Sequence, residues 1–241
     1  MYAVPVHEVL RMDRMISHEQ LKPRAWRKSD GPLCFVSHQW TDVDHPDPFG
    51  EQLAVLKDTL THLEELFTSP DHNESYAHPP LVSLADHSRL WIWLDYWSIP
   101  QSRERATERL KAIMSIPEFA FNASFLLVLC PPVAHRVTGA TCDFAAWEGR
   151  GWCRLERMAF IMPRYTVASP PAMYIVHGPR KFERGKNVIF LPSQSVFNGL
   201  FTVEADRGRL TGVVQTIFER GSSVLREQGD MAAWRKTLSM K

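Results

Sequence analysis

The stretch EGRGWCRLERMAF (residues 148–160) places a carboxylate near the start of a predicted helix that Gly151 opens. Trp152 and Glu156 are four residues apart, so they share one face of that helix. An acid in the first turn faces unpaired backbone N–H groups and the positive end of the helix dipole, which is an ordinary structural role. The same position favours the ionised carboxylate, and a fixed negative charge can stabilise a cation that forms in a reaction. Glu156 is therefore either a helix-start charge or the working residue of an enzyme.

A second group of candidate residues lies where the run LCFVSHQW (residues 33–40) turns from apolar to polar. This pattern is typical of a buried strand whose carboxyl end reaches a surface, and it places Ser37, His38 and Trp40 at that end. The acids and histidine of the next turn, TDVDHPDP, have the composition of a metal site. Their spacing fits no tetrahedral zinc template, so we expect a turn rich in Asp and Pro, with no metal.

The run LWIWLDYWSIP (residues 90–100) changes in the same way and predicts a second strand that ends in polar and aromatic residues. Asp95 lies near the end of this strand, where it can cap the following helix, hold a loop or contact a ligand. Trp97 follows it and is a candidate for an aromatic wall of a site.

These candidate residues must be positioned by the strands and helices around them. Five apolar runs predict strands, at residues 33–40, 90–100, 124–132, 172–178 and 187–192. Helices are predicted from Asp47 and Pro48 to about residue 69, over 102–123 with an interruption at Pro117, from Gly151, and over about 211–238. A loop of about twenty residues, 131–150, precedes the helix of Glu156, and loops of that length are often functional.

Strands that alternate with helices predict an α/β fold, in which a mostly parallel sheet has helices on both faces. Five strands fit the flavodoxin-like, doubly wound order 2-1-3-4-5. In that order a ligand binds outside the carboxyl ends of the first and third strands, which is where Ser37, His38 and Glu156 fall. We expect residues 1–32 to be an N-terminal extension that packs on the core, and residues 33–241 to form one domain.

The composition excludes several classes of protein. Hydrophobic residues make up 44% of the 241 residues, enough for a sizeable core, and the net charge of +1 gives no electrostatic basis for binding nucleic acid or an anionic membrane. The first residues lack the apolar stretch of a signal peptide, and the longest apolar run, FLLVLC, is too short to span a bilayer. The four cysteines are scattered without a CxxC pair, so we expect a cytoplasmic protein in which Cys153 is a small buried residue.

Three motifs in order resemble the Toll/interleukin-1 receptor (TIR) domain superfamily. FVSHQW resembles the first strand of these domains, WLDYWSIPQ resembles their second strand with its acid, and ASFLLVLCPP with GWCRLE is similar to their strand followed by Trp-Cys-x-x-Glu. The segment from LWIWLDYW to ASFLLVL also resembles the related heterokaryon-incompatibility (HET) domain, with Pro100-Gln101 in place of its Asn-Gln. The resemblance covers about residues 33–160, whereas the loop 131–150 is longer than usual and residues 165–241 carry no motif of either family.

Many TIR domains cleave the bond between nicotinamide and ribose in NAD, and the glutamate of Trp-Cys-x-x-Glu is essential for this. The resemblance therefore implies that Glu156 is catalytic, that NAD+ is a substrate, and that no cofactor or metal is tightly bound. Loss of nicotinamide leaves an oxocarbenium-like ribose, which a nearby carboxylate stabilises. The expected substrate contacts are polar groups at the strand ends and flat aromatic walls, from Ser37, His38, Trp40, Asp95, Trp97 and Trp152.

The families that the chain resembles imply a role as an effector in an immune or cell-death response, and two alternatives stay open. Other TIR domains are non-enzymatic adaptors that self-associate, often through the loop after the second strand. Here that loop is YWSIPQS, which is apolar enough to bind a partner. The third interpretation is an enzyme similar to nucleoside deoxyribosyltransferases, which also use a glutamate. Turnover of NAD, of nucleosides or of neither would separate the three.

Overall fold

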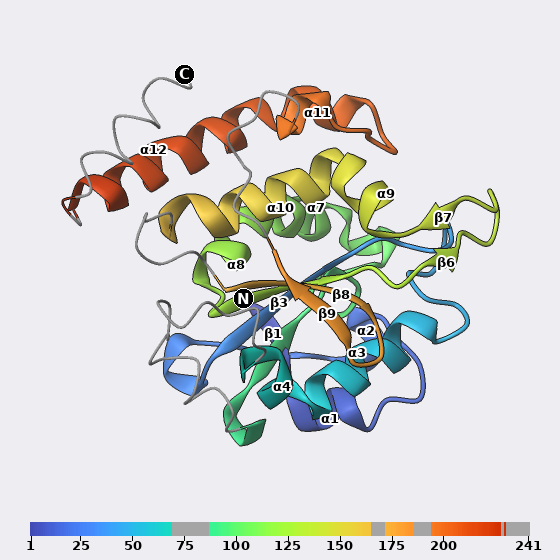
Figure 1. Cartoon of the computed structure of the whole chain (residues 1–241). Coiled ribbons are helices and arrows are strands. Elements are labelled where there is room, and N and C mark those ends of the chain that lie inside the picture. The colour runs from blue at the N-terminus through green and yellow to red at the C-terminus, as the bar shows by residue number, and fades with distance from the viewer. Residues whose placement is uncertain (69–86, 165–171, 186–193, 228, 230–241) are drawn as a thin grey trace.

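A seven-stranded sheet forms the centre of the protein in the computed structural model, which describes residues 1–68, 87–164, 172–185, 194–227 and 229 (Figure 1). The strands are β1 (Tyr2–Pro5), β2 (Arg24–Ala25), β3 (Leu33–His38), β4 (Trp91–Trp93), β5 (Phe125–Leu129), β8 (Met173–Gly178) and β9 (Lys181–Arg184). They lie in the order β2-β1-β4-β3-β5-β8-β9. The predicted α/β fold with a mostly parallel sheet is confirmed.

The four central strands, β4, β3, β5 and β8, run parallel and are rich in apolar residues because both faces of the sheet are covered. They are the first four predicted strands, and their order in space is 2-1-3-4 when they are numbered along the chain. The prediction of five strands is wrong, because β1, β2 and β9 add short antiparallel strands at the edges. A strand of four residues or fewer is too short to show an alternation of apolar and polar residues in the sequence. The predicted strand at 187–192 lies outside the described residues.

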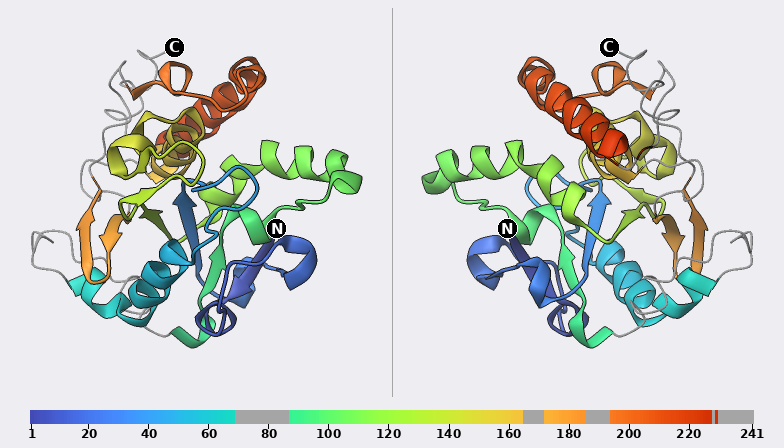
Figure 2. Two further views of the ribbon diagram at one scale, coloured as in Figure 1. Left: turned by 90° about the vertical axis from the view of Figure 1, so that its right-hand side faces the viewer. Right: turned by 90° about the vertical axis from the view of Figure 1, so that its left-hand side faces the viewer.

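Helices cover both faces of the sheet, as predicted (Figure 1). One face packs against α1 (Val6–Leu10), α3 (Glu51–Thr61) and α4 (Leu63–Thr68). The other packs against α8 (Ile116–Asn122) and α10 (Gly151–Ile161), and α12 (Thr211–Glu227) packs on the outer side of α10 (Figure 1). Helix α7 (Ala106–Met114) has no buried residue and projects from the body of the protein (Figure 2). A helix that projects in this way can form one wall of a cleft.

Several predicted elements begin or end elsewhere, each for a local reason. The strand predicted at 90–100 stops at Trp93, because Asp95–Ser98 form the short helix α6. Asp47 is not the N-cap of α3, which begins after Gly50, yet its Oδ2 accepts a hydrogen bond of 2.8 Å from the backbone N–H of Leu53 and so satisfies one of the free N–H groups there.

The predicted helix at 102–123 is interrupted, as expected from Pro117. Helix α7 ends at Met114, and α8 begins with the proline in its first turn, where no backbone N–H is needed. The closing helix predicted over 211–238 is present as α12 up to Glu227, and most of its predicted remainder lies outside the described residues.

The segment 131–150, which was expected to be a loop, is ordered into two small elements. A hairpin pairs β6 (Val133–Ala134) with β7 (Thr141–Cys142), and α9 (Phe144–Gly149) follows it. Strands of two residues and a helix of six are too short for a hydrophobic period to reveal. This segment leads directly into α10 and brings its own side chains to the site.

Residues 1–32 pack on the core and hold the chain after β4. Strand β1 pairs with β4, and Glu19 Oε1 accepts hydrogen bonds from the backbone N–H groups of Gln101 and Ser102, at 2.8 and 2.9 Å.

The four cysteines are buried and unpaired. Across the described residues, none of the helices has both the length and the apolar character needed to cross a membrane.

Candidate active site

A cavity of about 520 Å³ opens at the carboxyl ends of β3 and β4, between α7, α10 and the segment 202–209. Five of the predicted site residues line it, namely His38, Trp40, Asp95, Trp152 and Glu156. His38 is the last residue of β3, and Asp95 follows the end of β4 by two residues. The parallel arrangement of these strands therefore places both groups at one edge of the sheet, beside the helix that carries Glu156.

Glu156 is held at the floor of this cavity by Ser37, which is distant in sequence and is itself held by Trp147. The hydroxyl of Ser37 donates a hydrogen bond to Glu156 Oε2 at 2.5 Å. The indole N–H of Trp147, on α9, donates to Ser37 Oγ at 2.8 Å. Glu156 is buried, with 9% of its surface exposed, and Ser37 and Trp147 are more deeply buried. Ser37 thus positions the carboxyl group but does not itself line the cavity.

The protonation state of Glu156 differs from the expectation. Burial raises the pKa of Glu156 to about 8, the hydrogen bond from Ser37 opposes this shift, and the nearby carboxylate of Asp95 adds to it. Glu156 is the sixth residue of α10, whose first turn contains no acid, so the helix dipole acts on it only weakly. The prediction of a first-turn, ionised carboxylate is therefore wrong, and Glu156 in the free protein is mainly neutral at pH 7.

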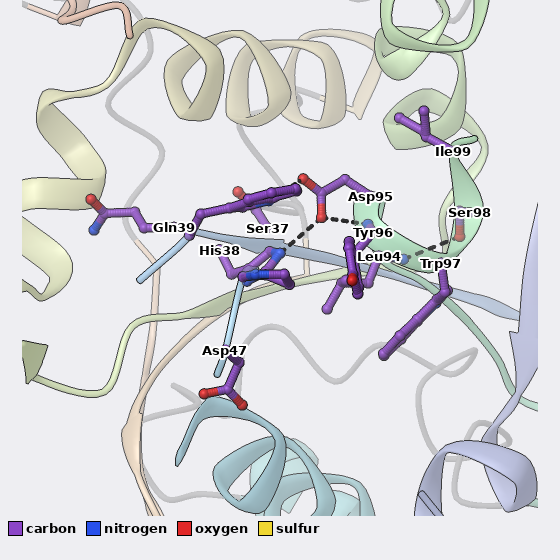
Figure 3. Close-up of polar contacts among 12 residues, drawn as sticks. Ser37, His38, Gln39, Asp47, Leu94, Asp95, Tyr96, Trp97, Ser98 and Ile99 are labelled. Atoms are coloured by element: carbon purple, nitrogen blue, oxygen red, sulfur yellow. Dashed lines mark hydrogen bonds and ion pairs between the residues drawn. The ribbon is translucent and has the colours of Figure 1, made fainter. Parts of the chain in front are cut away.

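His38, whose side chain is buried, forms an ion pair in the cavity wall with Asp95, whose side chain is 30% exposed (Figure 3). The amide nitrogen of Gln52 donates to the carbonyl of Gln39 at 2.7 Å, so Gln52 Oε1 must accept from His38 Nδ1 at 2.9 Å. Asp95 Oδ1 then faces His38 Nε2 at 2.9 Å. Because Asp95 also accepts from the indole of Trp40 at 2.8 Å, its carboxylate is satisfied in the ionised form, and both nitrogens of His38 act as donors.

The two pKa shifts agree with this charged pair. Burial alone would lower the pKa of His38, but the charge of Asp95 and the hydrogen bonds from His38 to Asp95 and Gln52 outweigh it and raise the pKa. Burial alone would raise the pKa of Asp95, but the charge of His38 and the hydrogen bonds from His38 and Trp40 lower it. Asp95 therefore holds His38 and Trp40 in place, and it also lines the cavity.

Trp152 forms another part of the wall and is fixed by the C-terminal region. Its indole N–H donates to Asp206 Oδ2 at 3.1 Å, from α11 (Ala205–Arg209). The segment before α11 closes over the start of α10, where the Gly151 N–H donates to the Leu200 carbonyl at 2.9 Å. Trp152 and Glu156 therefore share one face of α10 and both face the cavity, as their spacing predicted.

The segment before α11 can approach α10 this closely because Gly199 lies against Gly151. Substitution of Gly199 therefore tests whether this segment supports the cavity wall. A Cβ at Gly199 would lie 2.5 Å from the Cα and N of Gly151, and backbone atoms cannot move aside. We expect Gly199→Ala to lower the free energy of unfolding by about 1–3 kcal/mol and to weaken ligand binding, because the segment that carries Asp206 must shift. Urea unfolding measures the first effect. Gly212→Ala, at an exposed helical position with no atom within 4 Å, is the control and is expected to be neutral or stabilising.

Trp97 is a predicted site residue that lies away from the cavity. Trp97 is 0% exposed and packs in the core on the face of α1 and α3, and Figure 3 shows its ring and the Asp95 carboxylate extending in different directions. The expected aromatic wall at Trp97 is therefore absent, because α6 turns this ring into the core. Cys153 borders the cavity but is buried, and burial raises the pKa of its thiol well above the usual range, so it is the small core residue that was expected.

Arginine side chains that the sequence did not single out also line the cavity. Arg150 donates to Thr202 Oγ1 at 3.1 Å, and Arg209 donates to Asp206 Oδ1 at 3.1 Å. Arg109, on α7, makes a single hydrogen bond of 3.5 Å among the described residues, to the carbonyl of Gln101. Arg109 is thus the cation best placed to bind an anionic group. Trp147 was missed as well, and the only signal for it was the length of the segment 131–150.

The arrangement can bind a flat, phosphate-bearing molecule next to a carboxyl group. Indole rings of Trp40 and Trp152, the His38–Asp95 pair and Arg109 line the same cavity as Glu156. In the part of the chain that the structure describes, no group of three or more His, Cys, Asp or Glu side chains is arranged to hold a metal ion. Comparison with models of known families, with curated proteins and with solved structures found no match.

Proposed function

We propose that this chain is an NAD+ glycohydrolase with a flavodoxin-like, TIR-related fold, and that Glu156 is its catalytic carboxylate. The observation that carries the proposal is Glu156 itself, held by Ser37 at the floor of a cavity at the carboxyl ends of parallel strands. A volume of about 520 Å³ is within the usual range for sites that bind small molecules. The resemblance of GWCRLE to the TIR pattern points independently to the same residue.

The raised pKa of Glu156 fits a cationic substrate. The nicotinamide ring of NAD+ carries a positive charge, so its arrival beside Glu156 favours loss of the carboxyl proton. When the bond from nicotinamide to C1′ breaks, the ring nitrogen keeps the electron pair and the positive charge passes to the ribose. The carboxylate of Glu156 stabilises that charge until water adds to C1′ and releases a proton. The products are nicotinamide and ADP-ribose.

The phosphates of the substrate would bind at Arg109, and this can be tested separately from the chemistry. We expect Arg109→Gln to raise KM for NAD by about tenfold and to change kcat little, because a charge-assisted hydrogen bond to a phosphate is present in both the ground and transition states. Steady-state assays over a range of NAD concentrations measure both constants. Arg103→Gln removes an exposed arginine that does not line the cavity and should leave both constants unchanged.

The proposed activity is tested by incubating the purified protein with NAD and following nicotinamide and ADP-ribose by chromatography. The assay should be run in dilute solution and with the protein clustered on a surface, because TIR-type self-association is a further expectation. A panel of nucleosides and deoxynucleosides is included to detect an enzyme similar to deoxyribosyltransferases. A folded protein that releases no nicotinamide in either condition would reject the proposal. In a cell, this activity would deplete NAD, which is the basis for proposing an immune or cell-death effector.

The alternative hypothesis of a non-enzymatic adaptor depended on the loop YWSIPQS, and the structure of this loop does not support it. The two large apolar side chains of YWSIPQS that were expected to bind a partner, Trp97 and Ile99, are 0% and 3% exposed. Ile99 lines the cavity, and Trp97 is part of the core. Their apolar surface is therefore already used within the chain.

A further inference from the structure

The two hydrogen bonds that join Trp147, Ser37 and Glu156 have a defined direction. An indole nitrogen can only donate, so the 2.8 Å contact makes Ser37 Oγ an acceptor from Trp147. The single hydroxyl hydrogen of Ser37 is then directed to Glu156 Oε2, at 2.5 Å. Cys153, the other group near this hydroxyl, is a much weaker acceptor than a carboxyl oxygen. Glu156 Oε2 is therefore an acceptor. The carbonyl-type oxygen of a neutral carboxyl group accepts hydrogen bonds better than its O–H oxygen, so this arrangement favours the acidic proton on Oε1.

We propose that Trp147 is a positioning residue, which acts through Ser37 to hold Oε2 of Glu156 as an acceptor and so keeps the exchangeable proton on Oε1, the oxygen that faces the cavity. Oε1 has no hydrogen-bond partner among the described residues, and it is not fully buried. It is therefore accessible from the cavity that Glu156 lines. The catalytic meaning of this inference rests on the proposed function, but its test does not.

Trp147 is itself held rigidly, as a positioning residue must be. Asp143 caps α9 by accepting from the N–H of Ala146 at 2.9 Å, and the carbonyl of Asp143 accepts from the side chain of Gln39 at 3.0 Å. Gln39 follows β3 directly, so the strand end that carries Ser37 also anchors the helix that carries Trp147. Phe144 stacks on the indole at 5.7 Å between ring centres. These contacts fix the indole N–H relative to Ser37.

The consequence concerns where negative charge appears in the site. When Glu156 ionises, the proton leaves Oε1 through the cavity to solvent, and the oxygen that is freed faces the ligand. Oε2 keeps its hydrogen bond from Ser37 in both states, so no side chain has to reorganise. Without Trp147, Ser37 could rotate and accept the proton of Glu156, which would stabilise the neutral acid. Trp147 therefore favours the ionised form of Glu156.

The test is a titration of the Glu156 carboxyl carbon by NMR in Trp147→Phe, which keeps a ring but lacks the N–H. We expect the pKa of Glu156 to rise by about one unit relative to the wild type. Trp97→Phe is the matched control, because it removes an equally buried indole that donates to the Ile92 carbonyl and contacts neither Ser37 nor Glu156. The other titratable or charged groups that face Glu156, His38, Asp95, Arg150 and Cys153, are the same in both variants. A folded Trp147→Phe protein with an unchanged Glu156 pKa would overturn the proposal.

A second measurement uses the wild-type chain, in case Trp147→Phe does not fold. The ¹H–¹⁵N signal of the Trp147 indole should shift with pH at the midpoint of Glu156, and this response should disappear in Ser37→Ala. An indole signal that ignores the ionisation of Glu156 contradicts the proposal. If the chain cleaves NAD, the lower limb of its kcat/KM profile should also move about one pH unit upward in Trp147→Phe. If it does not cleave NAD, the two NMR titrations still decide the role of Trp147.

Discussion

Replacement of Glu156 by glutamine is expected to lower kcat for nicotinamide release by about 10²–10³-fold. The amide has the same size and can still accept the hydrogen bond from Ser37, but it carries no negative charge in any state. The loss therefore reports the electrostatic stabilisation of the ribosyl cation and not a change in packing. Chromatographic assay of nicotinamide at saturating NAD, with wild type and variant side by side, measures it.

The matched control is Glu227→Gln, which makes the same chemical change at an exposed position in the last turn of α12. It should have wild-type activity. Circular dichroism and thermal unfolding must show that Glu156→Gln is folded. Wild-type turnover in a folded Glu156→Gln protein would show that Glu156 is not catalytic. Whether the chain cleaves NAD at all is tested by the wild-type assay.

The second large effect is expected in the pH dependence of stability. The carboxyl group of Glu156 has a pKa of about 8 in the folded protein and an ordinary value of 4.5, so from pH 4.5 upward the unfolded chain ionises while the folded one stays neutral. A folded-state pKa that is raised makes stability fall as pH rises, until the folded group also ionises near pH 8. The accumulated loss is on the order of 3–5 kcal/mol.

Glu156→Gln removes this loss, because a neutral amide does not titrate. In urea unfolding, we expect the variant and the wild type to have similar stabilities at pH 5, and the variant to be more stable by about 3 kcal/mol at pH 9. The groups that face Glu156, namely His38, Asp95, Arg150 and Cys153, are present in both proteins, so the comparison isolates Glu156. Equal stabilities of the two proteins at pH 9 would show that Glu156 is not a buried group with a raised pKa.

Activity and stability should then change in opposite directions over the same pH interval. The form of Glu156 that stabilises a cation is the ionised one, so kcat/KM for NAD should rise with pH and level off near the pKa of the free protein. The folded protein is least stable in the state that the reaction requires. Activity and stability often oppose each other in this way at catalytic groups. Burial strengthens the electrostatic effect of the charged group on the substrate, and it also makes the charged form of that group less stable.

Much of the fold follows from local patterns in the sequence. The four parallel strands are apolar runs of a few residues that alternate with helices, and the change from apolar to polar at their ends marks the edge of the sheet where His38 and Asp95 lie. The spacing of Trp152 and Glu156 placed both on one face of α10. Hydrophobic period and helix spacing are properties of neighbouring residues, so the chain reveals them without its tertiary structure.

The edge strands and the segment 131–150 show the limit of this reasoning. Strand β1 has four residues and α9 has six, and elements of that size form because an existing sheet or helix offers them partners. Trp97 lies in the core for the same kind of reason, because α6 sets the direction of its side chain. An aromatic residue near a strand end is equally compatible with a wall and with the core when only the sequence is known.

The sequence by itself determined that a carboxylate would lie beyond the ends of parallel strands, on a helix that begins at Gly151. Only the tertiary structure decided what state that carboxylate is in. Ser37 lies 119 residues before Glu156 and Trp147 lies 110 residues after Ser37, yet the three form one hydrogen-bonded chain. A pKa depends on burial and on the charges and donors within a few ångströms, and these neighbours come from separate strands and helices that meet only in the folded chain.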